Sequence, residues 1–235
     1  MKPKAMLKVL VDIVMTAMIL MQMAYHFTDN KIHEWMGATL FVLFILHHVL
    51  NWNWYKSLFK GRYTAVRTLH TAVNLLLTAA MAGLLASGMM LSREVFDFMH
   101  LSSGRLGRRL HMLSTSWGFV LISMHLGFHW GMVVSTVKRL MKKLGINSSY
   151  PGLAARPAAV LLSVYGIYAF ITRQMWEKVL LLVEYAFFDF EEPVVFFFAD
   201  YIAIMGLFAC IAYYTAKLLR KRNPQSNLWQ SKGEE

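Results

Sequence analysis

"HEWMGATLFVLFILHHVLNW", residues 33–52, and "HMLSTSWGFVLISMHLGFHW", residues 111–130, share one layout. Aligned without gaps, they match His33 with His111, Phe41-Val42-Leu43 with Phe119-Val120-Leu121, His47 with His125, and Trp52 with Trp130. Each stretch is apolar enough for a membrane helix, and each carries two histidines 14 residues apart. A spacing that occurs twice in such surroundings calls for a common physical cause.

The composition around these two stretches is typical of a polytopic membrane protein. Of 235 residues, 57% are hydrophobic, and the mean hydropathy is +0.44. A helix needs roughly 20 apolar residues to cross a hydrocarbon core of about 30 Å. Six stretches reach this length, namely 5–25, 33–52, 70–91, 111–133, 157–175 and 194–217. We therefore predict an all-α protein with six transmembrane helices.

The net charge of +11 is explained by membrane topology. If the N-terminus is cytoplasmic, most of the 24 Lys and Arg residues fall on the cytoplasmic side of the six helices, as the positive-inside rule requires. The C-terminus is then cytoplasmic too. We expect an integral protein of a bacterial cytoplasmic membrane, in contact with lipid and without a nucleic-acid partner.

The predicted helices divide the chain into four parts. Residues 1–136 form a four-helix membrane bundle, and residues 137–156 form a basic cytoplasmic loop. Residues 157–219 form two further transmembrane helices with an acidic outer segment, and residues 220–235 form a cytoplasmic tail. Cys210 is the single cysteine, and no C-x-x-C-H motif occurs, so any haem would be held without covalent attachment.

The histidine spacing suits a pair of haem sites. On an α-helix, 14 residues rise about 21 Å and complete nearly whole turns, so both histidines lie on nearly one face. In the predicted topology the two helices run in the same direction, which places His33 level with His111 and His47 level with His125. One imidazole on either side of an iron is a ligand set for haem b. We expect an outer haem at His33 and His111 and an inner haem at His47 and His125.

Simple helix packing is the alternative explanation for these histidines. A lone membrane histidine is often a satisfied polar residue at a helix contact, and 14 residues are two heptads. Four histidines matched in spacing and depth favour haem, because ionisable groups within a bilayer are costly and usually functional. Gly37 and Gly118, on the same helices, would either let a macrocycle approach the backbone or pack against other helices.

Three further histidines gather near the inner level. His70 and His129 are candidates for a third haem, for a propionate contact or for a hydrogen bond to a quinone. His48 points about 100° away from His47 on the helix, so it either packs or hydrogen-bonds a ligand.

Charged residues accompany the predicted sites. Haem propionates are anions near the membrane surface, and the candidate cations beside them are Arg105, Arg108 and Arg109 outside and Arg67 inside. Topology-setting charge is the alternative explanation for these arginines. Asp12, with Lys8 one turn earlier, and Asp200 are either proton acceptors for a quinol or structural hydrogen-bonding groups.

The two histidine stretches, together with "ASGMMLS" at residues 86–92, resemble the flavinylation-associated membrane cytochrome family over about residues 5–135. Their layout is also similar to that of respiratory cytochrome b. The resemblance implies a haem protein that passes electrons from a quinol pool, or another cytoplasmic donor, to an extracytoplasmic partner carrying covalently attached FMN. It fits a subunit of a quinol-linked oxidoreductase, in a homo- or hetero-oligomer, and leaves open whether the chain is itself an enzyme.

A membrane metal centre is the main alternative function. His47, His48, His70, His125 and His129, with an HxxxH motif at 125–129, would hold the metal of a di-iron oxygenase or a metal transporter. This hypothesis leaves His33 and His111 unexplained, and the inner cluster contains no carboxylate ligand in the sequence pattern. A third alternative is an assembly subunit without a cofactor.

Overall fold

The computed structural model describes residues 3–101, 104–143, 145, 155–183 and 189–222. The described residues are 84% helical and contain no strand, which confirms the all-α prediction. Six long helices are α1 (Pro3–Met23), α2 (Asn30–Leu50), α4 (Ala65–Leu91), α5 (Gly104–Phe128), α7 (Ala155–Thr172) and α9 (Val194–Arg222). The shorter helices are α3 (Trp52–Ser57), α6 (Trp130–Lys143), α8 (Met175–Val179), η1 (Tyr25–Phe27) and η2 (Asp97–Met99).

Four of these helices, α1, α2, α4 and α9, are long and apolar enough to cross a membrane. α5 and α6 together meet the same criteria, but they are bent by 58° at the break between them. The apolar helix over Pro157–Thr172, within α7, is shorter. The helices indicate a membrane-embedded protein in contact with lipid, with four spans by length and composition, or up to five if the bent pair is one span.

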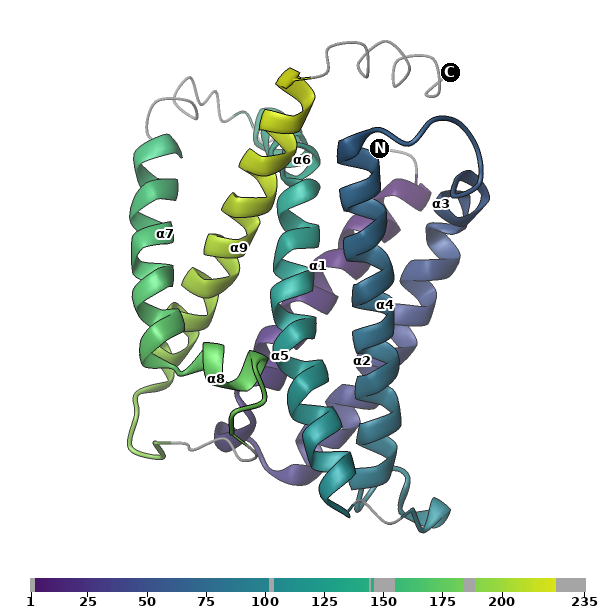
Figure 1. Ribbon diagram of the computed structural model, residues 1–235, viewed down its shortest axis with the longest axis vertical. Helices are drawn as coiled ribbons and strands as arrows, with labels where there is room; N and C mark the ends of the chain where they lie inside the picture. The colour runs from purple at the N-terminus through teal and green to yellow at the C-terminus, as the bar shows by residue number, and fades with distance from the viewer. Residues whose placement is uncertain (1–2, 102–103, 144, 146–154, 184–188, 223–235) are drawn as a thin grey trace.

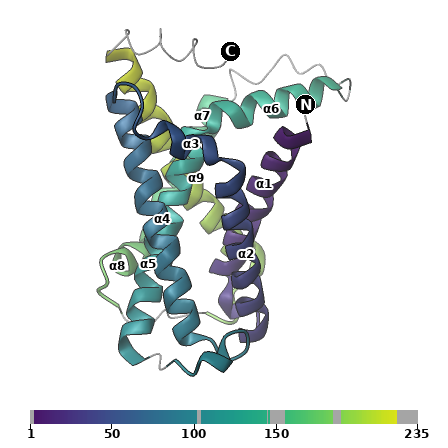
Figure 2. The ribbon, with the colours of Figure 1, turned by 90° about the vertical axis from the view of Figure 1, so that its right-hand side faces the viewer.

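The helices form two layers. In Figure 1 the helices α7, α9, α5 and α4 stand side by side, and Figure 2 shows α1 and α2 as a second layer beside α4 and α5. α1 begins and α9 ends at the same end of the molecule (Figure 1). α2, α5 and α9 run in one direction through it, so α2 and α5 are parallel, as the histidine argument requires.

α5 lies at the centre of the packing. It packs against α4 on one side and α9 on the other, while α1 packs against α2. Small residues allow these close approaches: a Cβ atom at Gly83 would collide with Ser114 of α5, and a Cβ atom at Gly127 would collide with the backbone of Ala209 in α9. α9 is therefore part of the core around α5, and α7 packs against α9.

Polar caps set where two helices of the bundle begin. Asp29 precedes α2, and its side chain accepts a hydrogen bond from the backbone N–H of Ile32 at 2.6 Å. Thr64 precedes α4, and its hydroxyl oxygen accepts a hydrogen bond from the backbone N–H of Arg67. Because a side-chain oxygen at the N-cap satisfies an otherwise free N–H group, the Asp29 cap places His33 in the first turn of α2.

The helix boundaries refine the predicted parts of the chain. The stretch predicted as one span over 111–133 breaks after Phe128, and α6 leaves it sideways (Figure 2). The predicted basic loop 137–156 therefore begins inside a helix, and its residues 144 and 146–154 lie outside the described residues. Most of the predicted tail, residues 223–235, and part of the acidic segment, residues 184–188, also lie outside them.

Candidate functional site

The structure brings the four principal histidines together in two facing pairs. The ring centres of His33 in α2 and His111 in α5 lie 6.3 Å apart, at an interplanar angle of 65°. The ring centres of His47 and His125, on the same two helices, also lie 6.3 Å apart, at 74°. The pairing at two levels that the 14-residue spacing predicted is therefore present.

Three of these rings are oriented by hydrogen bonds at Nδ1 from other helices. Asp12 Oδ1 of α1 lies 2.7 Å from Nδ1 of His47. On α4, Asn74 Oδ1 lies 2.8 Å from Nδ1 of His125, and Ser87 Oγ lies 3.1 Å from Nδ1 of His111. Histidines that ligate a metal commonly use the second ring nitrogen in this way, which fixes the ring and leaves Nε2 for the metal.

The other ring nitrogen is left open in all four histidines. Among the described residues, Nε2 of His33, His47, His111 and His125 takes part in no hydrogen bond. Nδ1 of His33 is buried and has no hydrogen-bond partner either. The four rings therefore form facing pairs whose Nε2 atoms have no protein partner, which is the arrangement that a ligand between the two helices requires.

The distance between the rings fits an iron placed between them. A bond from a metal to an imidazole nitrogen is about 2 Å long, and the ring centre lies about 1 Å behind that nitrogen. Two imidazoles on opposite sides of one iron thus have ring centres about 6 Å apart, close to the 6.3 Å of both pairs. Helix α2 has a single buried residue, Leu40, so the protein itself packs little against this helix.

The three additional histidines lie beside the inner pair. The ring centres of His70 and His129 are 6.2 Å apart, but His129 also contacts His125 at 4.7 Å. The ring of His70 stacks on Phe128 at 4.1 Å, and its Nε2 is buried without a hydrogen-bond partner. His70 and His129 thus share the ring distance of the two principal pairs, within more crowded surroundings.

His48 is held by a residue outside the pair. Its Nδ1 lies 2.6 Å from the hydroxyl of Tyr55 in α3, and Phe44 contacts the ring edge-on at 4.2 Å. No ring contact joins His48 to His125. Nε2 of His48 is buried without a hydrogen-bond partner, but among the described residues no histidine of α5 faces this ring, so His48 is not part of a facing pair.

The candidate propionate partners differ in their contacts. Arg67 donates hydrogen bonds to the backbone carbonyls of Ser57, Leu58 and Arg62 and stacks over Tyr63 at 4.3 Å. Its guanidinium thereby ties down the loop before α4. Arg105, Arg108 and Arg109 are exposed in the first two turns of α5, directly before His111.

The two glycines on the histidine helices face other helices. A Cβ atom at Gly37 would lie 2.9 Å from Gln22 Nε2, and one at Gly118 would lie 3.7 Å from Leu84 Cδ1. These neighbours belong to α1 and α4, so both glycines support helix packing. Gln22 Nε2 also donates to the backbone carbonyl of His33, at 3.2 Å.

Glu34 is a residue of the outer level that the sequence did not reveal. Its carboxylate accepts hydrogen bonds from the hydroxyl of Ser92 and from the backbone N–H groups of Arg93, Glu94 and Val95. These four bonds join the start of α2 to the end of α4. Because Glu34 follows His33, the contact holds the first turn of α2, and with it one histidine of the outer pair.

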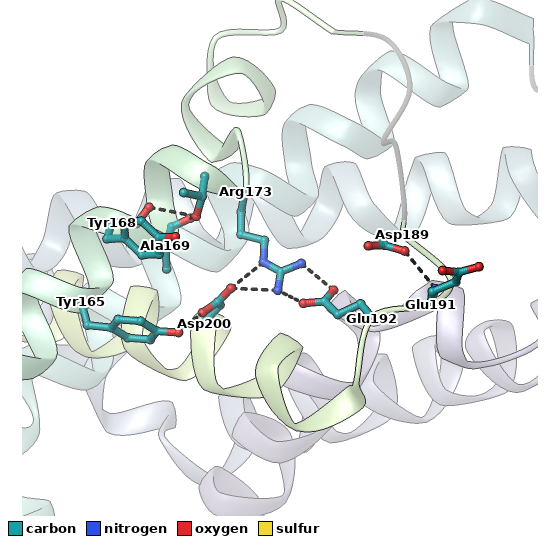
Figure 3. A network of polar contacts seen from close by, with 9 residues as sticks. Tyr165, Tyr168, Ala169, Arg173, Asp189, Glu191, Glu192 and Asp200 are labelled. Atoms are coloured by element: carbon teal, nitrogen blue, oxygen red, sulfur yellow. Dashed lines mark hydrogen bonds and ion pairs between the residues drawn. The ribbon is translucent and has the colours of Figure 1, made fainter.

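A second polar cluster lies between α7 and α9 (Figure 3). Arg173 donates from Nε to Asp200 at 2.8 Å, and its two terminal nitrogens contact the carboxylate of Glu192. Tyr165 donates to the other oxygen of Asp200 at 2.5 Å. Glu192 is the main cause that raises the pKa of Arg173. Asp200, predicted as a proton acceptor or a structural group, thus lies in a closed structural network.

A cavity of about 140 Å³ adjoins this network, and its lining includes His26, Lys178 and Tyr201. Burial is the main cause that lowers the pKa of Lys178, and the nearby Arg173 lowers it further. Burial likewise lowers the pKa of His26. Tyr25, the neighbour of His26, contacts the His33 ring at 4.9 Å, so the cavity lies near the outer histidine pair.

The metal-centre alternative requires several ligands around one point. Within the part of the chain that the structure describes, no group of three or more His, Cys, Asp or Glu side chains is arranged to hold a metal ion. A haem iron needs only two protein ligands, because the porphyrin supplies the others. The histidines present therefore fit haem better than a protein-only metal site.

Comparison with known proteins adds no further identification. No family model, no curated protein and no solved structure matches this chain.

Proposed function

We propose that this protein is a membrane-embedded cytochrome with two haem b groups that passes electrons across the membrane. His33 and His111 would hold one haem, and His47 and His125 would hold the other. The supporting observation is that both facing pairs have ring centres 6.3 Å apart, with Nε2 free of hydrogen bonds. Haem b supplies a one-electron Fe(III)/Fe(II) couple at each site.

The protein's part in this function is to orient and separate the two sites. Asp12, Asn74 and Ser87 hold three of the imidazole rings through Nδ1. Fourteen residues of helix place the sites about 21 Å apart along the bundle. Electrons that cross the membrane through this protein would pass from one site to the next.

Six spans with both termini in the cytoplasm complete the proposal. The bent pair α5 and α6 supplies the fourth span and α7 the fifth, which packs along α9. The excess of Lys and Arg at the end where α1 begins and α9 ends supports a cytoplasmic position for that end. His47 and His125 then form the inner site, in a bacterial cytoplasmic membrane.

The partners follow from the family resemblance. A quinol, or another reductant on the cytoplasmic side, would donate electrons, and an extracytoplasmic flavin-carrying protein would accept them. The exposed Arg105, Arg108 and Arg109 beside His111 offer positive charge to propionates or to an acidic partner surface. We place the chain in a quinol-linked oxidoreductase as its electron-transfer subunit.

The decisive experiment is a dithionite-reduced minus oxidised absorbance spectrum of the detergent-purified protein, with a pyridine haemochromogen assay for haem per chain. We expect a b-type spectrum and two haems per chain. Folded protein without haem, from cells with adequate haem supply, would overturn the proposal. A ratio of three would assign the additional haem to His70 and His129.

The ligand assignment is tested by alanine variants. His47→Ala and His125→Ala should each lose one haem and keep the other, because the outer pair remains intact. His48→Ala is the matched control and should keep both haems, since among the described residues no histidine of α5 faces His48 as His125 faces His47. If both haems persist in His47→Ala and in His125→Ala, the assignment is wrong.

A further inference from the structure

The two histidine pairs differ in the groups that contact Nδ1. At the inner pair, His47 faces the carboxylate of Asp12 at 2.7 Å and His125 faces the amide oxygen of Asn74 at 2.8 Å. At the outer pair, His111 has a hydroxyl at 3.1 Å. Nδ1 of His33 is buried and has no hydrogen-bond partner. The inner ligands thus have two strong acceptors, one of which is charged, and the outer ligands have one weaker acceptor.

The hydroxyl at the outer pair is already engaged elsewhere. Ser87 Oγ donates to the backbone carbonyl of Gly83 at 2.7 Å, with a second contact to the carbonyl of Leu84 at 3.2 Å. It therefore reaches His111 only as a neutral acceptor. A hydrogen bond to an ionised acceptor is roughly twice as strong as one between neutral groups, so Asp12 polarises its imidazole more than Ser87 does.

Such a bond changes what the ligand does to an iron. When Nδ1–H donates to a carboxylate, the imidazole becomes more basic and its Nε2 becomes a stronger donor to the metal. A stronger donor stabilises Fe(III) relative to Fe(II), and hydrogen bonding around the ligands is one means by which proteins set haem potentials. The negative charge of Asp12 acts in the same direction, because it favours the more positive oxidation state.

The surrounding cations do not cancel this effect at the inner pair. Lys8 lies one turn before Asp12, but it donates to Asn51 Oδ1 at 2.9 Å and not to the Asp12 carboxylate. Beside the outer pair, three arginines, Arg105, Arg108 and Arg109, precede His111 and add positive charge. Cations favour Fe(II), whereas the carboxylate of Glu34 beside His33 favours Fe(III), so the charges around the outer pair act in both directions and the difference between the two sites rests on the Nδ1 contacts.

We propose that Asp12 sets the order of the two reduction potentials, with the inner His47–His125 site below the outer His33–His111 site. This inference rests on the proposed function and gives it a direction, from the cytoplasmic to the extracytoplasmic side. One electron moves from Fe(II) held by His47 and His125 to Fe(III) held by His33 and His111. No bond forms or breaks and no proton is needed, and a quinol or reduced protein on the cytoplasmic side restores the inner Fe(II).

The test is a potentiometric titration of the purified full-length protein, followed by absorbance and by electron paramagnetic resonance. Asp12→Asn keeps an acceptor oxygen but removes the charge, so the lower potential should rise. We expect at least a tenfold change in the reduction equilibrium, which is about 59 mV for one electron. The higher potential should not change. In Asp12→Glu the lower potential should return most of the way to its wild-type value.

Asn74→Asp is the matched variant at the same site. It adds a carboxylate to the other inner ligand and should move the lower potential further down, which keeps the test valid if Asp12→Asn loses haem. Ser87→Ala should move only the higher potential, and by less. His47→Ala identifies the inner site, because the component that disappears belongs to it.

Two results would overturn the inference without touching the proposed function. One is a wild-type protein with two haems in which His47→Ala removes the higher component. The other is a lower potential that moves in neither Asp12→Asn nor Asn74→Asp while both haems remain bound. A wild-type protein that binds no haem would instead overturn the proposed function.

Discussion

Two regions of the protein differ in whether their polar groups have hydrogen-bond partners: the histidine region between α2 and α5, and the polar region between α7 and α9. Between α2 and α5, four imidazoles face one another in pairs, and none of their Nε2 atoms has a hydrogen bond within the described residues. Between α7 and α9, Arg173 is bonded to two carboxylates, one of which also accepts from Tyr165.

This difference separates a site that binds a ligand from one that stabilises the fold. The Arg173 cluster satisfies its polar groups within the protein and so contributes to the structure, whereas the histidine rings face each other in pairs with Nε2 left available for a ligand. The packing agrees, because α2 buries only Leu40, whereas α9 supplies many buried residues, including Phe197, Tyr201 and Ile204. Variants in the two regions should therefore affect different properties.

Removal of Arg173 should have the largest effect on stability. Arg173→Met leaves Glu192 and Asp200 facing each other with side chains only 13% and 12% exposed. Loss of one partner from a buried ion pair costs about 3–5 kcal/mol. We expect a fall in the thermal unfolding midpoint in detergent by several degrees, while the protein that remains folded keeps two haems per chain.

Arg173→Lys is the control for this experiment. It keeps the positive charge but lacks the fork that reaches both carboxylates, so its midpoint should lie between those of the wild type and Arg173→Met. An unchanged midpoint in Arg173→Met would contradict the stabilising role of the network. Loss of haem from otherwise folded protein would contradict the separation of the two regions.

Glu34 allows a smaller test on the histidine side. Glu34→Gln removes the charge that accepts bonds from Ser92 and three backbone N–H groups. Hydrogen bonds to charged groups contribute about 1.5–3 kcal/mol each, and these four are not independent. We expect about 1–3 kcal/mol of local destabilisation, seen as faster hydrogen exchange at the amides of Arg93, Glu94 and Val95.

The neighbouring acid provides the control for Glu34. The side chain of Glu94 is exposed and makes no hydrogen bond or ion pair within the described residues, so Glu94→Gln should leave the exchange rates unchanged. Equal rates in Glu34→Gln and the wild type would show that Glu34 does not hold the end of α2.

The histidine pairs could be predicted from the sequence because they depend on one helix at a time. Equal spacing on two parallel apolar helices places His33 beside His111 and His47 beside His125 whenever the helices face each other. The partners at Nδ1 could not be predicted, because they depend on how α1 and α4 are rotated against the pair. One signal was present: Asn74 and Ser87 lie 13 residues apart in α4, nearly the histidine spacing.

The remaining differences arise from contacts between distant segments. The carboxylate of Glu34 meets a loop almost 60 residues later in the chain, and Arg173 meets Asp200 across two helices. No change in hydropathy or charge marks the helix break after Phe128, because "GFHWGMV" continues the hydrophobic run. Six apolar stretches were sufficient to predict the helices but not their bends or their polar contacts.

The smallest predicted effect concerns His26, which lies between the two regions. It lines the cavity beside Arg173, and its ring contacts Phe197 of α9 at 4.9 Å. Burial is the main cause that lowers its pKa from 6.5. The charges that face it act in both directions, because Glu192 and Asp189 raise the pKa while Arg173 and Lys178 lower it. The net result is a histidine that takes up a proton less readily in the folded protein than in the unfolded chain.

The sign of the pH effect follows from this difference. Below pH 6.5 the unfolded chain binds a proton at His26 before the folded protein does, so acid favours unfolding. His26 should therefore have no effect on the pH dependence above about pH 7 and should lower stability as the pH falls through 6.5. Thermal midpoints at pH 7.5 and 5.5 measure it: the decrease should be smaller in His26→Gln than in the wild type, and unchanged in His100→Gln, whose side chain is exposed. An equal decrease in His26→Gln and the wild type would show that protonation of His26 is not linked to unfolding. The stabilising region between α7 and α9 would then include the Arg173 network but not His26.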